Sequence, residues 1–266
     1  MSVEYKQTSG EALFSGTFAG ALTPFSSQPF FNSKIEQQTN GGSLIEAFKK
    51  LTLEKKIYNG VMINSGVNAA VYGAQYFCYK KILKIIGGEN PSKKQEVIAS
   101  LWSAFFTFLP CNATEMVIIR KGLMIDEFKI LNRAKPTYLQ VILDIYRNQG
   151  LKGFAKGWKF MFLRELVFVP TFCIGGPWIA NIILNFIHNK PISDLIGGSL
   201  AGASGSSVSH FADTNQTRLK KDQQVTRVPK ELFQGVGTRC FYVGMELSLF
   251  TMINRIIKDF QKQLHK

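Results

Sequence analysis

An arginine and a glutamate stand side by side at Arg164 and Glu165, inside an otherwise apolar stretch. A guanidinium group can bind a carboxylate through two parallel hydrogen bonds, and a carboxylate can bind an ammonium group. The pair therefore has the chemistry to hold both ends of a zwitterion. Ionisable residues within a membrane-spanning segment are costly and by default mark a pathway for solutes. A second interpretation, in which the pair faces a neighbouring helix or lipid headgroups, stays open.

Three related blocks of sequence organise the chain around this pair. The strongest block runs from Gln149 to Gly157, and two degenerate copies run from Ile57 to Gly60 and from Leu232 to Gly235. Each follows a segment rich in Gly, Ala and Ser that ends in a polar cluster, at 29–38, 110–115 and 211–218. A unit that cannot close its own core must assemble with its copies. The pattern predicts a single domain over residues 1–266, with repeats near 8–86, 94–187 and 192–262.

The hydrophobic pattern predicts an all-α membrane protein with six spans. Hydrophobic residues make up 45% of the chain and charged residues 19%, yet the mean hydropathy is only +0.03. That value is low for helices bathed in lipid, but it suits spans that line a water-filled cavity. About 20 residues suffice to cross the hydrocarbon core, and the candidate spans lie near 10–37, 60–86, 96–121, 154–187, 194–218 and 233–258. The alternative is a soluble helical protein with a large core.

Glycine spacing favours the membrane interpretation. The first span contains Gly16-x-x-x-Gly20, and the fifth contains Gly198-x-x-x-Gly202-x-x-Gly205. Such steps allow close approach of helices in lipid, whereas a soluble helix loses about 1 kcal/mol for each Gly relative to Ala. Two short amphipathic stretches, 43–51 and 138–148, predict surface helices between the spans.

The arrangement resembles the mitochondrial carrier family over almost the whole chain. The family motif is Pro-x-Asp/Glu-x-x-Lys/Arg-x-Lys/Arg-x-Gln, followed by an acidic-Gly-x-x-x-x-aromatic-Lys/Arg-Gly block. The matching residues are Asp213 and Arg218 in the third copy, Lys34 and Gln38 in the first, and Gly150 with Lys156-Gly157 in the second. Ala155 stands where the block expects its aromatic residue, and Gln149 where it expects an acid. The resemblance implies six transmembrane helices in three pseudo-symmetric repeats, with short amphipathic helices on the matrix side. It also implies a multi-pass monomer of the mitochondrial inner membrane without cofactor or metal.

The resemblance implies a solute carrier that works by alternating access through a central cavity. The family offset of seven residues after each block glycine gives the contact positions Val67, Arg164 with Glu165, and Tyr242. An Arg followed by an acid here resembles the amino-acid and related zwitterion carriers. Further candidate cavity residues are Asn64, Asn68, Gln75, Arg239 and Glu246. The glycines Gly60, Gly157 and Gly235 resemble the family's cardiolipin sites, where backbone amides at helix N-termini can hold phosphate.

The polar clusters depart from the family's gate pattern. The positions that are normally acidic read Phe31, Asn112 and Asp213, and the basic ones read Lys34, Glu115 and Gln216, with Gln38 completing the first cluster. Pairing them between repeats predicts one ion pair, Asp213–Lys34, and one amide hydrogen bond, Asn112–Gln216. Glu115 is left without a partner. We therefore expect gating that differs from the pattern of the family. Transport would be less tightly coupled and more like that of a uniporter, or the gate would close by hydrophobic contact.

Two other functions remain open at this point. The divergence from the family pattern is compatible with an adenine nucleotide (ATP/ADP) exchanger, including one encoded by a pathogen and acting in host mitochondria. The charges inside the even-numbered spans are balanced, Arg164 and Arg239 against Glu165 and Glu246, which disfavours a polyanion. The weakened gates favour a different alternative, a membrane scaffold that uses the carrier fold without transport.

The distribution of charge and the remaining reactive residues limit the classes of partner and of site that the sequence predicts. The formal net charge is +14, and three segments, 32–57, 120–159 and 218–231, are rich in Lys and Arg. The positive-inside rule places these segments on one side of the membrane, where they suit anionic lipid. They alternate with apolar spans rather than forming one basic face, so nucleic-acid binding is not expected. The four cysteines and three histidines are isolated, and we expect no metal site, no catalytic thiol and no enzyme activity.

Overall fold

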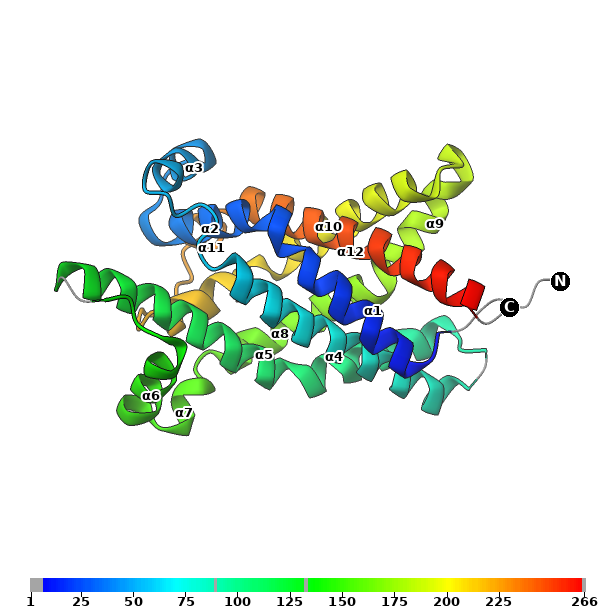
Figure 1. Cartoon of the computed structure of the whole chain (residues 1–266), viewed down its shortest axis with the longest axis horizontal. Coiled ribbons are helices and arrows are strands. Elements are labelled where there is room, and N and C mark those ends of the chain that lie inside the picture. Colours follow the sequence, from blue (N-terminus) through cyan, green and yellow to red (C-terminus); the bar gives the residue numbers. More distant parts are fainter. Residues whose placement is uncertain (1–6, 89, 132–133, 265–266) are drawn as a thin grey trace.

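The computed structural model describes residues 7–88, 90–131 and 134–264, and these residues form helices and connecting turns without a strand (Figure 1). The long helices run roughly along the longest axis of the molecule. Helices α3 (Leu44–Leu53) and α6 (Tyr138–Gln149) lie at one end, and α9 (Gly176–Ile187) lies at the other.

The first predicted span forms two consecutive helices, α1 (Ser9–Leu22) and α2 (Pro24–Asn40). Thr8 and Glu11 form a reciprocal capping box at the start of α1, which satisfies two backbone N–H groups that have no partner within the helix. Pro24 occupies the first position of α2, where its missing N–H group costs little. The chain therefore changes helix at Thr23 without leaving the helical conformation.

The remaining predicted spans are helical as well, and turns or irregular segments such as 221–228 connect some of them. These spans form α4 (Val61–Gly87), α5 (Lys93–Ile130), α8 (Trp158–Pro170), α9, α10 (Lys190–Lys220) and α12 (Val236–Leu264), and the π-helical turn η1 (Thr171–Gly175) joins α8 to α9. Short helices α7 (Leu151–Phe154) and α11 (Pro229–Leu232) precede α8 and α12. The two predicted surface helices are present as α3 and α6, each with a side-chain capping box at its start.

Three helical segments of the described chain are long and apolar enough to cross a membrane: Lys93–Ile125, Leu151–Ile187 and Pro229–Leu264. The other three predicted spans form helices but do not reach that apolarity. A physical reason is visible in α2 and α10, which bury Ser, Thr, Asn and Gln side chains against their neighbours. Hydropathy alone therefore identifies half of the predicted crossings, and the other crossings and the threefold repeat stay predictions.

The glycine that ends each sequence block adopts the same unusual backbone conformation. Gly60, Gly157 and Gly235 have φ angles of 83°, 78° and 78°. Gly60 and Gly157 are the N-caps of α4 and α8, and Gly235 directly precedes α12. Only glycine enters this left-handed region without a steric cost from Cβ. The block glycines are thus needed for the turn into each of three long helices.

The predicted glycine steps lie where helices approach closely. A Cβ atom on Gly20 of α1 would lie 2.4 Å from the carbonyl oxygen of Asn68 in α4. On α10, a Cβ atom on Gly198 would lie 2.4 Å from the carbonyl oxygen of Leu247 in α12, and Gly202 is similarly close to α12. Because these neighbours are backbone atoms, they cannot rotate away. The small residues therefore set the distances between α1 and α4 and between α10 and α12.

Replacing Gly198 by alanine should destabilise the protein, because the added methyl group must push α10 away from α12. Overpacking of this kind costs about 1–3 kcal/mol. Thermal unfolding in detergent micelles would measure the loss. Gly122 of α5 is a matched control, since a Cβ atom there meets no atom within 4 Å. Gly122→Ala should leave stability unchanged or raise it by up to about 1 kcal/mol through helix propensity; equal destabilisation by both changes would contradict the packing argument.

Candidate functional site

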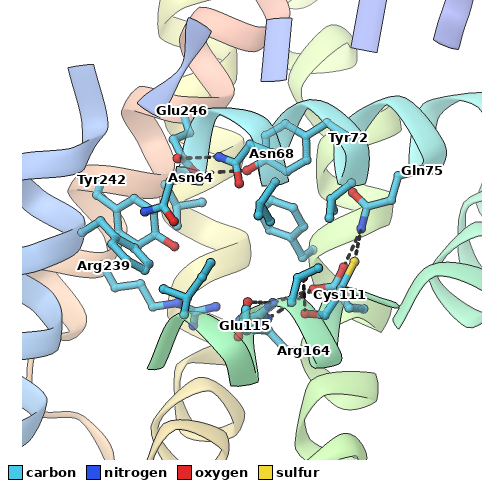
Figure 2. A pocket seen from close by; sticks show the side chains of 18 of the residues that line it. Asn64, Asn68, Tyr72, Gln75, Cys111, Glu115, Arg164, Arg239, Tyr242 and Glu246 are labelled. Atoms are coloured by element: carbon cyan, nitrogen blue, oxygen red, sulfur yellow. Dashed lines mark hydrogen bonds and ion pairs between the residues drawn. The ribbon is translucent and has the colours of Figure 1, made fainter. Parts of the chain in front are cut away.

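A cavity of about 90 Å³ lies between α2, α4, α5, α8 and α12 (Figure 2). Every residue predicted to contact a solute lines this cavity: Val67, Asn68, Arg164, Glu165, Arg239, Tyr242 and Glu246. Further polar lining comes from Gln28, Asn64, Tyr72, Gln75, Thr114 and Glu115. Side chains from five helices that are far apart in sequence thus converge on one polar space inside the bundle.

Arg164 is held by three carboxylates. Its Nη2 atom lies 2.5 Å from Glu115 Oε1 and 3.0 Å from Glu165 Oε1, and its Nη1 atom lies 3.3 Å from Asp213 Oδ1. Gln75 donates a hydrogen bond of 2.8 Å to the second carboxylate oxygen of Glu165. The adjacent Arg164–Glu165 pair is therefore part of a larger network, in which α8 joins α4, α5 and α10.

Asp213 of α10 forms a second centre of the network. Lys34 of α2 lies 3.0 Å from its Oδ2 atom, so the ion pair predicted from the repeats is present. Arg239 of α12 lies 3.5 Å from the same oxygen and also donates to the carbonyl oxygen of Ser206 and the hydroxyl of Ser209. Asp213, Lys34 and Arg239 are all buried. One carboxylate therefore ties together α2, α8, α10 and α12.

The expectation that Glu115 lacks a partner is wrong. Besides Arg164, its carboxylate accepts hydrogen bonds from Gln216 at 2.9 Å and from Lys220 at 3.2 Å. Lys220 lies one helical turn after Gln216 on α10, and its side chain is fully buried. The pairing between repeats used only the acidic position and the first basic position of each cluster. Arg164 lies on α8 instead, and Lys220 stands where the family motif has its final Gln. We call Lys34, Glu115, Arg164, Asp213, Lys220 and Arg239 the charged layer.

The other predicted gate residues lie around the charged layer. Gln216 donates a hydrogen bond of 3.4 Å to the side-chain oxygen of Asn112, as the repeats predicted, and Asn112 also donates to the carbonyl oxygens of Phe154 and Lys156. Phe31 packs edge-on against Tyr242, with ring centroids 5.7 Å apart. The side chain of Gln38 lies outside the part of the chain that the structure describes.

Glu246 lines the cavity at a distance from the charged layer, and Figure 2 shows it across the space from Arg164. Its carboxylate accepts hydrogen bonds from Ser27 at 2.8 Å, Tyr72 at 3.0 Å and Asn68 at 3.3 Å. These donors are uncharged, and within the described residues no Lys or Arg forms an ion pair with Glu246. The cavity thus presents one carboxylate that is oriented by neutral groups and, in the part of the chain that the structure describes, forms no ion pair.

An aromatic cluster closes the cavity on the side away from the charged layer. Phe172 and Phe250 have ring centroids 4.2 Å apart, and Tyr72 lies 5.0 Å from Phe172 and 5.8 Å from Phe250. Tyr76 completes the cluster at 6.0 Å from Phe250. Phe172 belongs to η1, and π-helical turns inside α-helices occur frequently at functional sites. Tyr72 lines the central cavity, whereas Tyr76 lines a second cavity, so the cluster separates the two.

Sequence reasoning missed this aromatic cluster and Lys220. Phe172 and Phe250 stand in apolar stretches where any large side chain would fit the pattern. A usable signal for Lys220 was its spacing of four residues from Gln216, which places both on one face of α10.

The block glycines lie outside the cavity lining. Gly60 is exposed, and Gly157 and Gly235 are half-buried at the starts of their helices. Nothing in this arrangement tests their predicted contact with lipid phosphate, which stays a prediction.

Neither a comparison with protein-family models nor a search of curated proteins gives a match to this chain. The geometry of the cavity and the distribution of polar and apolar side chains therefore provide the basis for a function.

Proposed function

We propose that this protein is a membrane carrier that moves a small charged solute through its central cavity by alternating access. The observation that carries the proposal is the position of the cavity between two barriers, the charged layer on one side and the aromatic cluster on the other. A carrier needs a binding site that opens to each side in turn. Each barrier is built from several helices, so a change in the relative position of those helices would open one side.

The distribution of side chains supports a membrane setting. Large aromatic residues are exposed along α5 and α9, including Trp102, Phe106, Trp178 and Phe186. The interior, in contrast, contains the charged layer and many buried amides and hydroxyls. Soluble proteins show the opposite distribution, whereas polar residues within a bilayer face the interior of the bundle. Six crossings in three repeats, a monomer, and residence in the mitochondrial inner membrane with cardiolipin as lipid partner complete the proposal.

The cavity chemistry favours an amino acid or a similar zwitterion. Glu246 offers an oriented carboxylate for an ammonium group. Across the cavity, a solute carboxylate would compete with Glu115, Glu165 and Asp213 for the guanidinium group of Arg164. Among the lining residues, the cations Arg164 and Arg239 are outnumbered by the acids Glu115, Glu165 and Glu246. Lys34, Lys220 and Asp213 lie just outside the lining and bring the count to four cations against four acids. A polyanion such as ATP would therefore find no surplus of positive charge in this medium of low dielectric. The cavity is also small beside the roughly 300–1,000 Å³ typical of sites for drug-sized ligands.

Uptake by liposomes that contain the purified protein tests this function. Labelled basic and zwitterionic amino acids and labelled ATP and ADP form the panel, and we expect saturable uptake of an amino acid. Arg164→Ala should abolish uptake, because no other cavity residue supplies a two-pronged donor at that position. Arg164→Lys keeps the charge but not the planar fork and should retain only part of the activity.

The competing functions predict different uptake results. Saturable uptake of ATP and not of amino acids would assign nucleotide exchange instead. Flat uptake of every solute by protein that unfolds cooperatively would favour the scaffold, since a charged layer that never separates would hold the cavity shut. A comparable loss of uptake in the exposed variant Lys230→Gln would show that the Arg164 effect is not specific.

A further inference from the structure

A second cavity, of about 270 Å³, lies where α9, the start of α10 and the end of α12 meet, beyond the aromatic cluster. This end of the molecule is opposite α3 and α6 (Figure 1). The lining of this cavity is rich in cations: Lys190, Arg255, Lys258 and Lys262, against the single acid Asp259. A concave site with this excess of positive charge attracts anions.

Arg255 is held in place within the second cavity. Its Nη2 atom lies 2.9 Å from Asp194 Oδ1 and donates a hydrogen bond of 2.8 Å to the side-chain oxygen of Asn181. Asp194 is buried, so the guanidinium group is anchored from the protein side. An anchored guanidinium loses little conformational freedom when it binds an oxyanion.

Asn254 supplies a polar group of a different kind. The residue is 7% exposed and lines the second cavity. Its side-chain nitrogen donates to the hydroxyl of Tyr76 at 3.0 Å, while its side-chain oxygen is buried and has no hydrogen-bond partner among the described residues. A buried acceptor without a partner is costly, and a ligand that donates a hydrogen bond removes that cost.

We propose that the second cavity is a binding site for a small oxyanion that also carries a hydrogen-bond donor, of which hydrogenphosphate is the simplest. Its charged oxygens accept from Arg255 and the surrounding lysines, and its P–OH group donates to the Asn254 side-chain oxygen. Sulfate has the same shape and charge but carries no proton at neutral pH. The site therefore distinguishes the two ions through Asn254. This inference goes beyond solute movement through the central cavity and does not depend on transport.

Calorimetric titration of the full chain in nanodiscs of uncharged lipid tests the proposal, with inorganic phosphate and sulfate as probes. We expect saturable phosphate binding and sulfate affinity that is about tenfold weaker, the effect of one hydrogen bond to a neutral amide oxygen. Lys262→Gln should weaken the binding of both ions, whereas Lys230→Gln, at the opposite end of the molecule, should weaken neither. Asn254→Leu, which keeps the approximate shape, should reduce phosphate affinity to that of sulfate.

Four results would overturn the proposal. Absence of saturable phosphate binding, or equal binding by the wild type and Lys262→Gln, would rule out the cavity as the site. Equal affinities for phosphate and sulfate in the wild type would refute the role of the Asn254 oxygen. Loss of phosphate binding in discs with anionic phospholipid would assign the cations to lipid headgroups, whose phosphodiesters lack the donor. Unchanged affinity in those discs supports a free anion.

Discussion

Replacing Asp213 by asparagine should lower the free energy of unfolding by about 3–5 kcal/mol, the usual effect of removing one partner from a buried ion pair. Asp213 neutralises Lys34 at 3.0 Å and Arg239 at 3.5 Å, and both cations are buried. Arg164 would keep its contacts with Glu115 and Glu165, so the loss falls on the other two cations. Thermal and denaturant unfolding in detergent micelles would measure it.

Asp222→Asn is a matched control for this prediction. Asp222 is an exposed residue that pairs with Lys156, and such surface pairs contribute about 0–1 kcal/mol. The double variant Lys34→Met with Asp213→Asn should recover part of the stability, because it removes one of the charges left unpaired. Equal stability of Asp213→Asn and Asp222→Asn would show that Asp213 is not the centre of the charged layer. The absence of any recovery of stability in the double variant would show the same.

Replacing Glu246 by glutamine should weaken the apparent affinity for an ammonium-bearing solute by roughly 30-fold, which corresponds to the loss of about 2 kcal/mol from a charge-assisted contact. Glutamine keeps the length of the side chain and an oxygen that can accept from Ser27 or Tyr72, so the fold should persist. Uptake measured over a range of solute concentrations should show the effect in the half-saturation concentration.

Glu231→Gln provides the control for the charge change, since Glu231 forms an exposed pair with Arg218 far from the cavity. That variant should transport like the wild type. If Glu246→Gln transports normally while Arg164→Ala is inactive, the ammonium group does not bind at Glu246. If both are inactive and both unfold normally, the two residues act on the same solute from opposite sides of the cavity.

The sequence predicted much of the helical framework, because its strongest signals are local. The resemblance placed Gly60, Gly157 and Gly235 at helix N-termini, and α4, α8 and α12 begin directly after them. Capping boxes accompany the starts of α3 and α6. The Lys34–Asp213 contact followed from the spacing of the repeats. Three of the predicted crossings, in contrast, do not stand out by apolarity, because helices that line a polar interior carry the residues that lower hydropathy.

The candidate site was harder to predict, because its contacts depend on side chains reaching between helices. Arg164 was predicted to face a solute, but its reach to Glu115 and Asp213 depends on the distances among α5, α8 and α10. Lys220 escaped prediction because it stands at the final Gln position of the motif, which the pairing between repeats did not use. The aromatic cluster depends on the π-helical turn that carries Phe172, and one extra residue in a helical turn has no distinct signature in an apolar stretch.

That π-helical turn also sets the relation between the two cavities. A turn that accommodates one extra residue shifts the angular phase of every later side chain by about 100°, the rotation per residue of an α-helix. Before the shift, α8 directs Arg164 and Glu165 into the central cavity; after it, α9 directs Asn181 toward Arg255 in the second cavity. A continuous α-helix would hold the two faces in a different alignment. The π-helical turn thus rotates the side chains of α9 relative to those of α8, so that one helical segment directs residues into two cavities that lie in different directions.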